Sequence, residues 1–258
     1  MRVPMADPLQ ETADALARAM RDGTSTMPIP EALLADPSAA YALQERVRAA
    51  LGEPMAGWKI GATNAKAQTA LATDRPFFGP IPTRRVHPDG ATIDLPEGCA
   101  GAEIELAFRL AQPLPRRDAP YSEGELIEAI ENMHPAIELI GLRQEKAGPL
   151  TALRAIADFG AHVAFVAGPA IDGWNELDPG EITARCMVDG RVAGEGRASG
   201  VLGGPLVALA WLADHGPGLD AGAWISTGTI TGLAAVAPGA EVVGDFGAQG
   251  QVRLSFRP

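Results

Sequence analysis

Residues 103–110 constrain the fold more than any other segment, because polar and apolar side chains alternate strictly along them. One face carries Ile104, Leu106, Phe108 and Leu110, and the other carries Glu103, Glu105, Ala107 and Arg109. A period of two is typical of a half-buried β-strand. The same period places the carboxylates of Glu103 and Glu105 side by side, with no cation between them in the sequence.

The two adjacent carboxylates need a compensating partner. Like charges on one strand face repel, so the pair destabilises the strand unless a cation offsets it. Mg²⁺ and Mn²⁺ prefer oxygen ligands. A third acid, Glu138, lies in the apolar run 136–140, where an acid is rarely placed for solvation. Glu103, Glu105 and Glu138 are therefore candidate metal ligands. The alternative is that the first two occupy a solvated face and Glu138 pairs with an arginine.

Lys59 is the candidate catalytic residue. It lies in the short apolar segment 57–61, which has a glycine at each end. This pattern indicates either an edge-strand lysine that reaches water or a cation directed into a site. Near three carboxylates and a metal, an ammonium group could bind or protonate an oxyanion, because burial and neighbouring charges tune its pKa.

The composition limits the classes of partner. The chain has 258 residues, of which 47% are hydrophobic, and a formal net charge of -11. It is long enough for a sizeable core, and its acidity argues against a nucleic-acid or anionic-membrane partner. We find neither a signal-peptide pattern nor an uninterrupted apolar run of about 18 residues. Cys99 and Cys186 are too few for a disulfide framework, which favours reduced thiols and a cytoplasmic location.

Helical periodicity dominates the start of the chain and strand patterns dominate the rest. We expect a helical N-terminal lobe over residues 1–56 and a catalytic mixed-β domain over residues 57–258, together an α+β fold. Ser122 and Glu125 form a capping box at a helix start, and Asp189-Gly190 predicts a hairpin. The segment 74–82 is rich in proline, glycine and phenylalanine and is predicted to be a loop.

Several other segments lack the residue order of known phosphate-binding, nucleophile or zinc motifs. The glycines within residues 194–204 lack the order of a phosphate-binding loop, and a G-x-S-x-G nucleophile elbow is absent. The four histidines have no zinc-binding spacing and are interpreted as structural; they are His87, His134, His162 and His215.

A set of motifs in a fixed order carries a family resemblance. They are Gly-Trp-Lys-Ile-Gly-Ala-Thr at 57–63, Phe-Gly-Pro at 78–80, Ala-Glu-Ile-Glu-Leu-Ala-Phe at 102–108, His-Pro-Ala-Ile-Glu at 134–138, Thr-Gly-Thr at 227–229 and Val-Gly-Asp-Phe-Gly at 243–247. The sequence resembles the 2-keto-4-pentenoate hydratase family. That family belongs to the fumarylacetoacetate hydrolase superfamily and includes the 4-oxalocrotonate decarboxylases. The resemblance runs from about residue 57 to the end of the sequence.

The resemblance implies a fold and a set of site residues. The fold would be a mixed rolled β-sheet domain of the fumarylacetoacetate hydrolase C-terminal type with a helical N-terminal lobe, assembled as a homo-oligomer. Mg²⁺ or Mn²⁺ would be held by Glu103, Glu105 and Glu138. Thr229 would lie near the substrate carboxylate, although its hydroxyl could instead bond the backbone of a tight turn. Asp158 is a second candidate substrate-binding residue.

The implied activity is a metal-dependent hydratase. It would add water to a 2-hydroxypenta-2,4-dienoate-like acid to give a 4-hydroxy-2-oxo acid. The same enolate chemistry serves a 2-oxo acid decarboxylase or an acylpyruvate-type C–C hydrolase, and a non-catalytic 2-oxo acid binding protein is a further alternative. One departure concerns Phe77, which stands where many hydratases of the family carry an acidic residue. Asp74 is close to it in sequence.

Overall fold

Two long antiparallel strands form the centre of the molecule. The computed structural model describes residues 7–144 and 150–258. In it, β5 (Cys99–Leu110) pairs with β6 (Ile130–Gly141) along almost their whole length. The apolar face predicted for β5 lies in the main core. The opposite face is also buried, since Ala107 packs with Ile81 and Phe165. The expectation of a half-buried strand was therefore wrong, because the curled sheet encloses its inner face.

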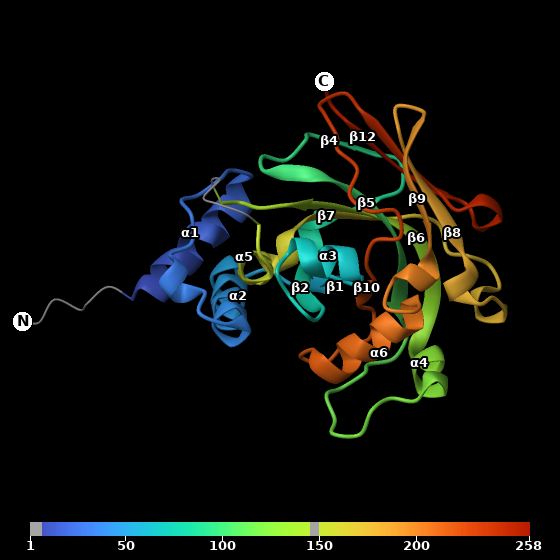
Figure 1. Ribbon diagram of the computed structural model, residues 1–258, viewed down its shortest axis with the longest axis horizontal. Helices are drawn as coiled ribbons and strands as arrows, with labels where there is room; N and C mark the ends of the chain where they lie inside the picture. The colour runs from blue at the N-terminus through green and yellow to red at the C-terminus, as the bar shows by residue number, and fades with distance from the viewer. Residues whose placement is uncertain (1–6, 145–149) are drawn as a thin grey trace, which may run out of the picture.

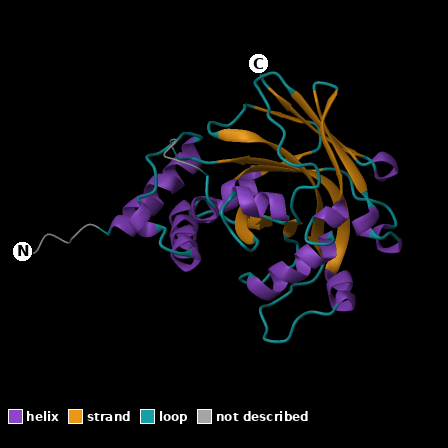
Figure 2. Cartoon of the chain, in the orientation of Figure 1, coloured by secondary structure: helices purple, strands orange, loops and turns teal. Residues whose placement is uncertain are grey.

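The strands form two mixed sheets, which confirms the expected α+β fold (Figure 2). The seven-stranded sheet has the order β2 (Phe77–Pro82), β1 (Met55–Gly61), β10 (Trp224–Ser226), β5, β6, β7 (His162–Ala167), β3 (Val86–Pro88). The five-stranded sheet has the order β4 (Ala91–Ile93), β12 (Gln251–Phe256), β11 (Glu241–Asp245), β8 (Thr183–Val188), β9 (Arg191–Arg197). Among the strands of the described residues, β1 pairs in parallel with β10, β3 with β7 and β4 with β12. The largest apolar cluster includes residues of both sheets, so it joins them.

The helices flank these sheets (Figure 1). The α-helices are α1 (Pro8–Asp22), α2 (Pro37–Leu51), α3 (Ala65–Ala70), α4 (Glu123–Ala129), α5 (Ala152–Ala157) and α6 (Pro205–His215). The 3₁₀ turns are η1 (Glu31–Leu33), η2 (Thr83–Arg85), η3 (Phe159–Ala161), η4 (Trp174–Glu176), η5 (Pro179–Glu181), η6 (Ala198–Gly200) and η7 (Gly247–Gln249). The predicted capping box opens α4. The predicted Asp189-Gly190 turn joins β8 and β9, with positive φ at both residues. No helix of residues 7–144 or 150–258 has the length and apolarity needed to cross a bilayer.

The N-terminal helices do not form a closed core by themselves. Figure 1 shows α1 and α2 together at one end of the molecule, beside α5. Their apolar cluster also contains Phe77 and Phe159, which come from later in the sequence. The predicted boundary after residue 56 stays a prediction, since the packing continues across it.

Strand β2 corrects one prediction. The segment 74–82 was expected to be a loop, yet residues Phe77–Pro82 pair with β1. Proline cannot donate to a neighbouring strand, so it is confined to edges. β2 is the edge of the seven-stranded sheet, and Pro80 and Pro82 are tolerated there. Composition indicated a loop because it does not reveal which strand will be an edge.

Candidate metal centre and active site

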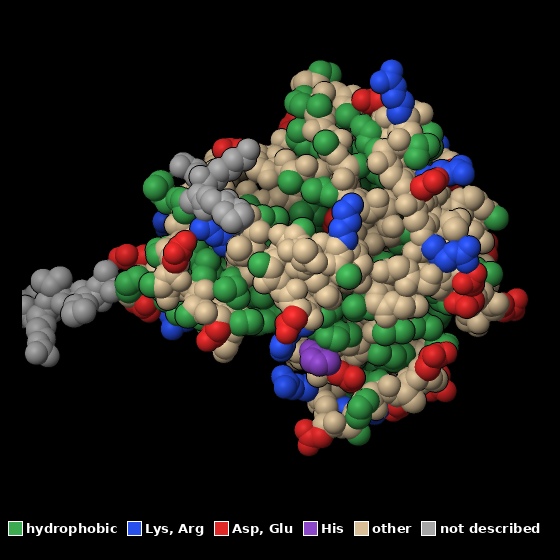
Figure 3. Space-filling view, viewed as in Figure 1, with side chains coloured by type: hydrophobic (Ala, Val, Ile, Leu, Met, Phe, Trp, Pro, Cys, Tyr) green, Lys and Arg blue, Asp and Glu red, His purple; other side chains and the backbone are tan. Residues whose placement is uncertain are grey.

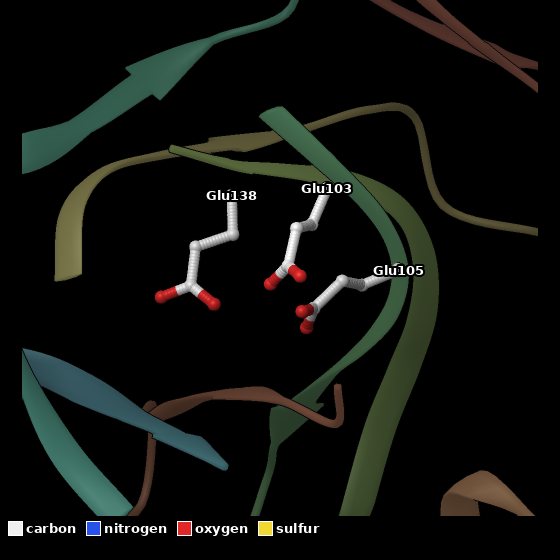
Figure 4. A group of neighbouring side chains, drawn as sticks. All are labelled: Glu103, Glu105 and Glu138. Atoms are coloured by element: carbon white, nitrogen blue, oxygen red, sulfur yellow. The ribbon is translucent and has the colours of Figure 1, made fainter. Parts of the chain in front are cut away.

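Three carboxylates converge inside the curled sheet. Glu103, Glu105 and Glu138 each offer an oxygen, and these oxygens lie within 4.8 Å of one another. Figure 4 shows the three side chains pointing toward one another, two from β5 and one from β6. The strand register explains the meeting, because Glu103 pairs directly with Glu138. Glu105 follows two residues later on the same face, and Glu105 and Glu138 are fully buried.

The cluster is electrostatically unfavourable without a cation. Burial and then the charge of Glu105 raise the pKa of Glu103 to about 8. Burial and then Glu138 raise the pKa of Glu105 to about 8, and burial raises the pKa of Glu138 to about 7. Burial lowers the pKa of Lys59, but the three glutamates outweigh this and raise it overall. Three carboxyl groups therefore face one ammonium group.

Hydrogen bonds fix one oxygen of each fully buried glutamate. Ser226 Oγ and the Gly228 amide donate to Glu105 Oε2 over 2.5 and 2.8 Å. His162 Nδ1 lies 2.8 Å from Glu138 Oε1. Burial, followed by Lys59 and nearby arginines, lowers the pKa of His162 well below its ordinary value. A neutral imidazole protonated on Nδ1 donates to Glu138, so His162 orients this carboxylate.

The remaining oxygens fit a hard divalent cation. Within the described part of the chain, buried Glu105 Oε1 has no hydrogen-bond partner. Glu138 Oε2 lies 3.2 Å from Lys59 Nζ but lacks a hydrogen bond of good geometry. A buried carboxylate oxygen without a partner is costly. Three carboxylates that present free oxygens to one point match the ligand preference of Mg²⁺ and Mn²⁺.

Lys59 is buried beside the carboxylates and is only 3% exposed, so it is not an edge-strand lysine that reaches water. Its ammonium group donates to the carbonyl of Gly160 over 3.0 Å. Gly160 has a φ of +68°, and a Cβ atom there would lie 2.9 Å from Lys59 Cδ. Glycine at this turn therefore avoids both the strain of a left-handed backbone and a close contact with the lysine stem.

A cavity of about 230 Å³ opens beside Lys59 and Glu103. In Figure 3, a hollow near the centre of the face is bordered by hydrophobic side chains and by a Lys or Arg side chain. Thr63 and Thr229 are further polar residues of the cavity lining. Thr229 Oγ1 accepts a hydrogen bond from the Gly232 amide over 2.9 Å, as the turn interpretation requires. Its position in the lining also suits a substrate contact, which stays a prediction.

Asp158 is held away from the cavity. It is fully buried, and its two oxygens accept hydrogen bonds from the backbone amide and the guanidinium of Arg143. Arg143 also donates to the carbonyl of His162. Asp158 is not a lining residue of the cavity described above. Its contact with substrate stays a prediction, and the geometry gives it a positioning role through Arg143 and His162.

Phe77 forms an apolar wall where the family resemblance led us to look for an acid. Its side chain is buried and lines the cavity. A Cβ atom on Gly61 would lie 2.4 Å from Phe77 Cε2, so the ring packs directly on the glycine backbone. Asp74 does not replace the acid, because it is exposed and pairs with Arg75.

Sequence reasoning missed three residues that support the glutamates. Ser226 and His162 bond the glutamates, and Arg143 bonds the carbonyl of His162. A buried serine or histidine within an apolar strand is a weak signal by itself. Its partner is set by strand pairing: Ser226 lies opposite Lys59 on β1 and opposite Ala107 on β5.

A comparison with protein families identifies the family that shares this fold. The sequence model of the fumarylacetoacetate (FAA) hydrolase C-terminal family matches residues 43–257. The chain belongs to this family. Family membership accounts for the curled mixed sheet and confirms the resemblance drawn from the ordered motifs.

Curated relatives extend over most of the chain. 2-Keto-4-pentenoate hydratase 1 of Dechloromonas aromatica is 31% identical over 244 residues, which cover 89% of this chain and 90% of the relative. The 2-oxo-hept-4-ene-1,7-dioate hydratase of Escherichia coli is 30% identical over 84% of this chain and 85% of the relative.

Among solved structures, 4-oxalocrotonate decarboxylase from Pseudomonas putida G7, complexed with magnesium and adipate, has a TM-score of 0.86. It is 24% identical, and the match covers 99% of this chain and 100% of that one. This likeness shows that the fold is shared along the whole chain.

Proposed function

We propose that this protein is a divalent-metal-dependent hydratase. It would convert a 2-hydroxypenta-2,4-dienoate-like acid into a 4-hydroxy-2-oxo acid. The observation that carries the proposal is the convergence of Glu103, Glu105 and Glu138 beside buried Lys59. Lys59 and Glu103 also line a cavity of about 230 Å³. The relatives named 2-keto-4-pentenoate hydratase support the same reaction.

Each group has a role in this reaction. The three glutamates would hold Mg²⁺ or Mn²⁺, which when bound supplies a Lewis acid for the 2-oxygen of the substrate. Lys59 would donate a proton to the dienol carbon chain as the 2-hydroxyl loses one, which forms the unsaturated ketone. Water then adds across the double bond conjugated to that ketone. Thr229 would bind the substrate carboxylate, and the apolar walls would keep bulk water away from the reacting carbons.

Product analysis tests the proposal. The purified protein is stripped with a chelator and assayed with 2-hydroxypenta-2,4-dienoate, with and without added Mg²⁺. We expect Mg²⁺-dependent loss of the dienol absorbance and formation of 4-hydroxy-2-oxopentanoate, identified by NMR. Absence of turnover with the metal restored would overturn the proposal. Release of CO₂ from a 2-hydroxydienedioate, without hydration of the dienoate, would replace it with the decarboxylase.

We also propose that the protein is a cytoplasmic homo-oligomer. Cys99 and Cys186 are both free thiols, which suits a reducing compartment. Light scattering coupled to size exclusion tests the assembly. A molecular mass above that of one chain is expected, and the 26.8 kDa of a monomer would contradict it.

A further inference from the structure

Hydroxyl groups near the carboxylate cluster differ in whether the protein itself satisfies them. Ser226 Oγ donates to Glu105, and Thr229 Oγ1 accepts a hydrogen bond from the Gly232 amide. Thr63 is only 2% exposed and lines the cavity. Its Oγ1 nevertheless has no hydrogen-bond partner in the described part of the chain.

The cavity accounts for the little surface that Thr63 exposes. Its Oγ1 does not belong to the fully enclosed oxygens without a partner, which include Glu105 Oε1. This oxygen is therefore within reach of a molecule in the cavity. A hydroxyl can donate one hydrogen bond and accept two, and a nearly buried one without a partner is costly. A polar group bound in the cavity would remove that cost.

The backbone holds Thr63 in place from both sides. Ala62, just before it, has a φ of +55°, and its carbonyl accepts a hydrogen bond from the Gln68 side chain over 3.0 Å. The carbonyl of Thr63 accepts one from the Leu202 amide over 2.9 Å. A non-glycine residue in the left-handed region is strained and persists only where its surroundings fix it. The position of the Thr63 side chain is therefore fixed before any ligand binds.

Thr63 also lies close to the candidate metal centre. A Cβ atom on Gly228 would lie 2.3 Å from Thr63 Oγ1, so the threonine side chain packs directly on that glycine. The Gly228 amide donates to Glu105 Oε2. Lys59 and Glu103 belong to the same cavity lining as Thr63. A molecule held at the glutamates is therefore within the neighbourhood of this hydroxyl.

We infer that the Thr63 hydroxyl binds the oxygen atom that the reaction adds to its substrate. The atom is first the attacking water and then the 4-hydroxyl of the product. This inference rests on the proposed function and deepens it by assigning the water-binding residue. Ser226 and Thr229 are less suited to this role, because the protein already bonds their hydroxyls.

The addition needs neither an acid nor a base from Thr63. The water oxygen forms a bond to C4 of the unsaturated ketone, and the electron pair of the C3=C4 double bond moves toward C3 and the 2-oxygen. The water releases one proton to solvent and C3 takes one up, so atoms and charges balance. Thr63 accepts a hydrogen bond from the water and keeps its own proton, so it acts by orienting the water against C4.

Two ligands that differ by one hydroxyl test the inference. Binding of 4-hydroxy-2-oxopentanoate and of 2-oxopentanoate is measured by calorimetry in the presence of Mg²⁺. The wild-type protein should prefer the hydroxylated ligand about fivefold, the size of one neutral hydrogen bond. Thr63→Val keeps the side-chain shape and should bind the two ligands equally, whereas Thr63→Ser should restore the preference. An unchanged preference in Thr63→Val would overturn the inference.

Turnover provides a second readout that a packing role would not move. With 2-hydroxypenta-2,4-dienoate, Thr63→Val should still consume the dienol at the wild-type rate. It should form the hydrated product about tenfold more slowly, because the water is no longer oriented. The unsaturated ketone 2-oxopent-3-enoate should therefore accumulate, as detected by NMR. Thr69→Val, at an exposed position of α3, is the control and should behave like the wild type. Wild-type hydration by Thr63→Val would contradict the inference.

Failure of this inference and failure of the proposed function are distinguishable. Mg²⁺-dependent hydration by the wild type, with no change in ligand preference in Thr63→Val, would overturn the role of Thr63 alone. Absence of turnover by the wild type, with a preference for the hydroxylated ligand that Thr63→Val loses, would overturn the hydratase and leave hydroxyl binding by Thr63 standing. Failure of Mg²⁺ to support binding of either 2-oxo acid would overturn both.

Discussion

Two buried ionic groups lie within one region of the molecule, and they are built in opposite ways. Asp158 faces Arg143, which satisfies both of its oxygens and also donates to the carbonyl of His162. The cluster of Glu103, Glu105 and Glu138 has three acids and one lysine, and Glu105 Oε1 has no partner among the described residues. The Arg143–Asp158 pair has balanced charges and complete hydrogen bonds. The glutamate cluster has more acids than cations and an oxygen without a partner.

The difference distinguishes a structural ion pair from a candidate metal-binding cluster. A buried ion pair with complete hydrogen bonds needs nothing further from a ligand, although breaking it is costly. A buried cluster of like charges raises the pKa of its members and persists only where something else stabilises it. We therefore propose a positioning role for the Arg143–Asp158 pair and metal binding for the glutamates.

The largest expected effect comes from removing one candidate ligand. Glu105→Gln keeps the side-chain shape but should abolish measurable Mg²⁺ binding and turnover. The metal-free protein should stay folded, because the substitution removes a repelling charge. Calorimetry and thermal unfolding measure the two effects. Glu131→Gln, at an exposed position of β6, is the matched control and should change neither. Wild-type Mg²⁺ affinity in Glu105→Gln would refute the ligand assignment.

Removing the charge of Lys59, beside the cluster, should slow the reaction and leave metal binding intact. Lys59→Met should lower kcat about a thousandfold, within the ~10²–10⁴ typical of general acid–base groups, without weakening Mg²⁺ binding. Lys59→Arg should not restore activity, because the lysine stem packs closely against Gly160 and leaves little room for a guanidinium. Steady-state kinetics and calorimetry measure these effects. Full activity in Lys59→Met would show that the ammonium group has no catalytic role.

Breaking the Arg143–Asp158 pair should lower the stability of the fold. Asp158→Asn leaves the buried guanidinium of Arg143 without a counter-charge and should destabilise the fold by about 3–5 kcal/mol. Urea unfolding measures the change. Asp74→Asn breaks an exposed pair with Arg75 and should leave the unfolding midpoint unchanged. If Asp158→Asn abolished substrate binding at unchanged stability, a direct substrate contact would replace the positioning role.

The pH dependence of stability and of Mg²⁺ affinity distinguishes the buried cluster from exposed acidic residues. The pKa values of Glu103 and Glu105 rise from 4.5 to about 8 in the folded, metal-free protein. The folded state then binds more protons than the unfolded state over this interval, so metal-free stability should fall as pH rises through it. Metal competes with those protons, so Mg²⁺ affinity should increase about tenfold or more from pH 6 to pH 8. Affinity independent of pH in this interval would mean that the ligands are already ionised.

The smallest effect concerns Thr229. If its hydroxyl binds the substrate carboxylate, Thr229→Val should raise KM about fivefold, corresponding to ~1 kcal/mol, with little change in kcat. Thr231→Val, in the same loop, is the control. Unchanged kinetics would leave the hydrogen bond from the Gly232 amide as the whole role of Thr229.

Local patterns in the sequence were sufficient for the parts of the site that lie on one strand. Alternation along β5 placed Glu103 and Glu105 on one face, and the glycines around Lys59 indicated a strand. The capping box of α4 and the Asp189-Gly190 turn were predicted for the same reason, because each depends on residues close in sequence.

The remainder depends on pairing between distant segments. The β5–β6 register that sets Glu138 opposite Glu103 is fixed by the packing of both strands, and neither strand specifies it alone. The same holds for Ser226 and His162, whose partners lie 121 and 24 residues away. β2 was missed because proline is compatible with a strand only at an edge, and edges are a property of the whole sheet.

Crystals grown with Mn²⁺ and oxalate, and examined by anomalous diffraction at the manganese edge, test the central claim most directly. We predict one strong anomalous peak coordinated by Glu103, Glu105 and Glu138, with oxalate bound on its open side next to Lys59. A peak at another position, or three carboxylates that remain without a metal at saturating Mn²⁺, would contradict the assignment of this cluster as the catalytic metal centre.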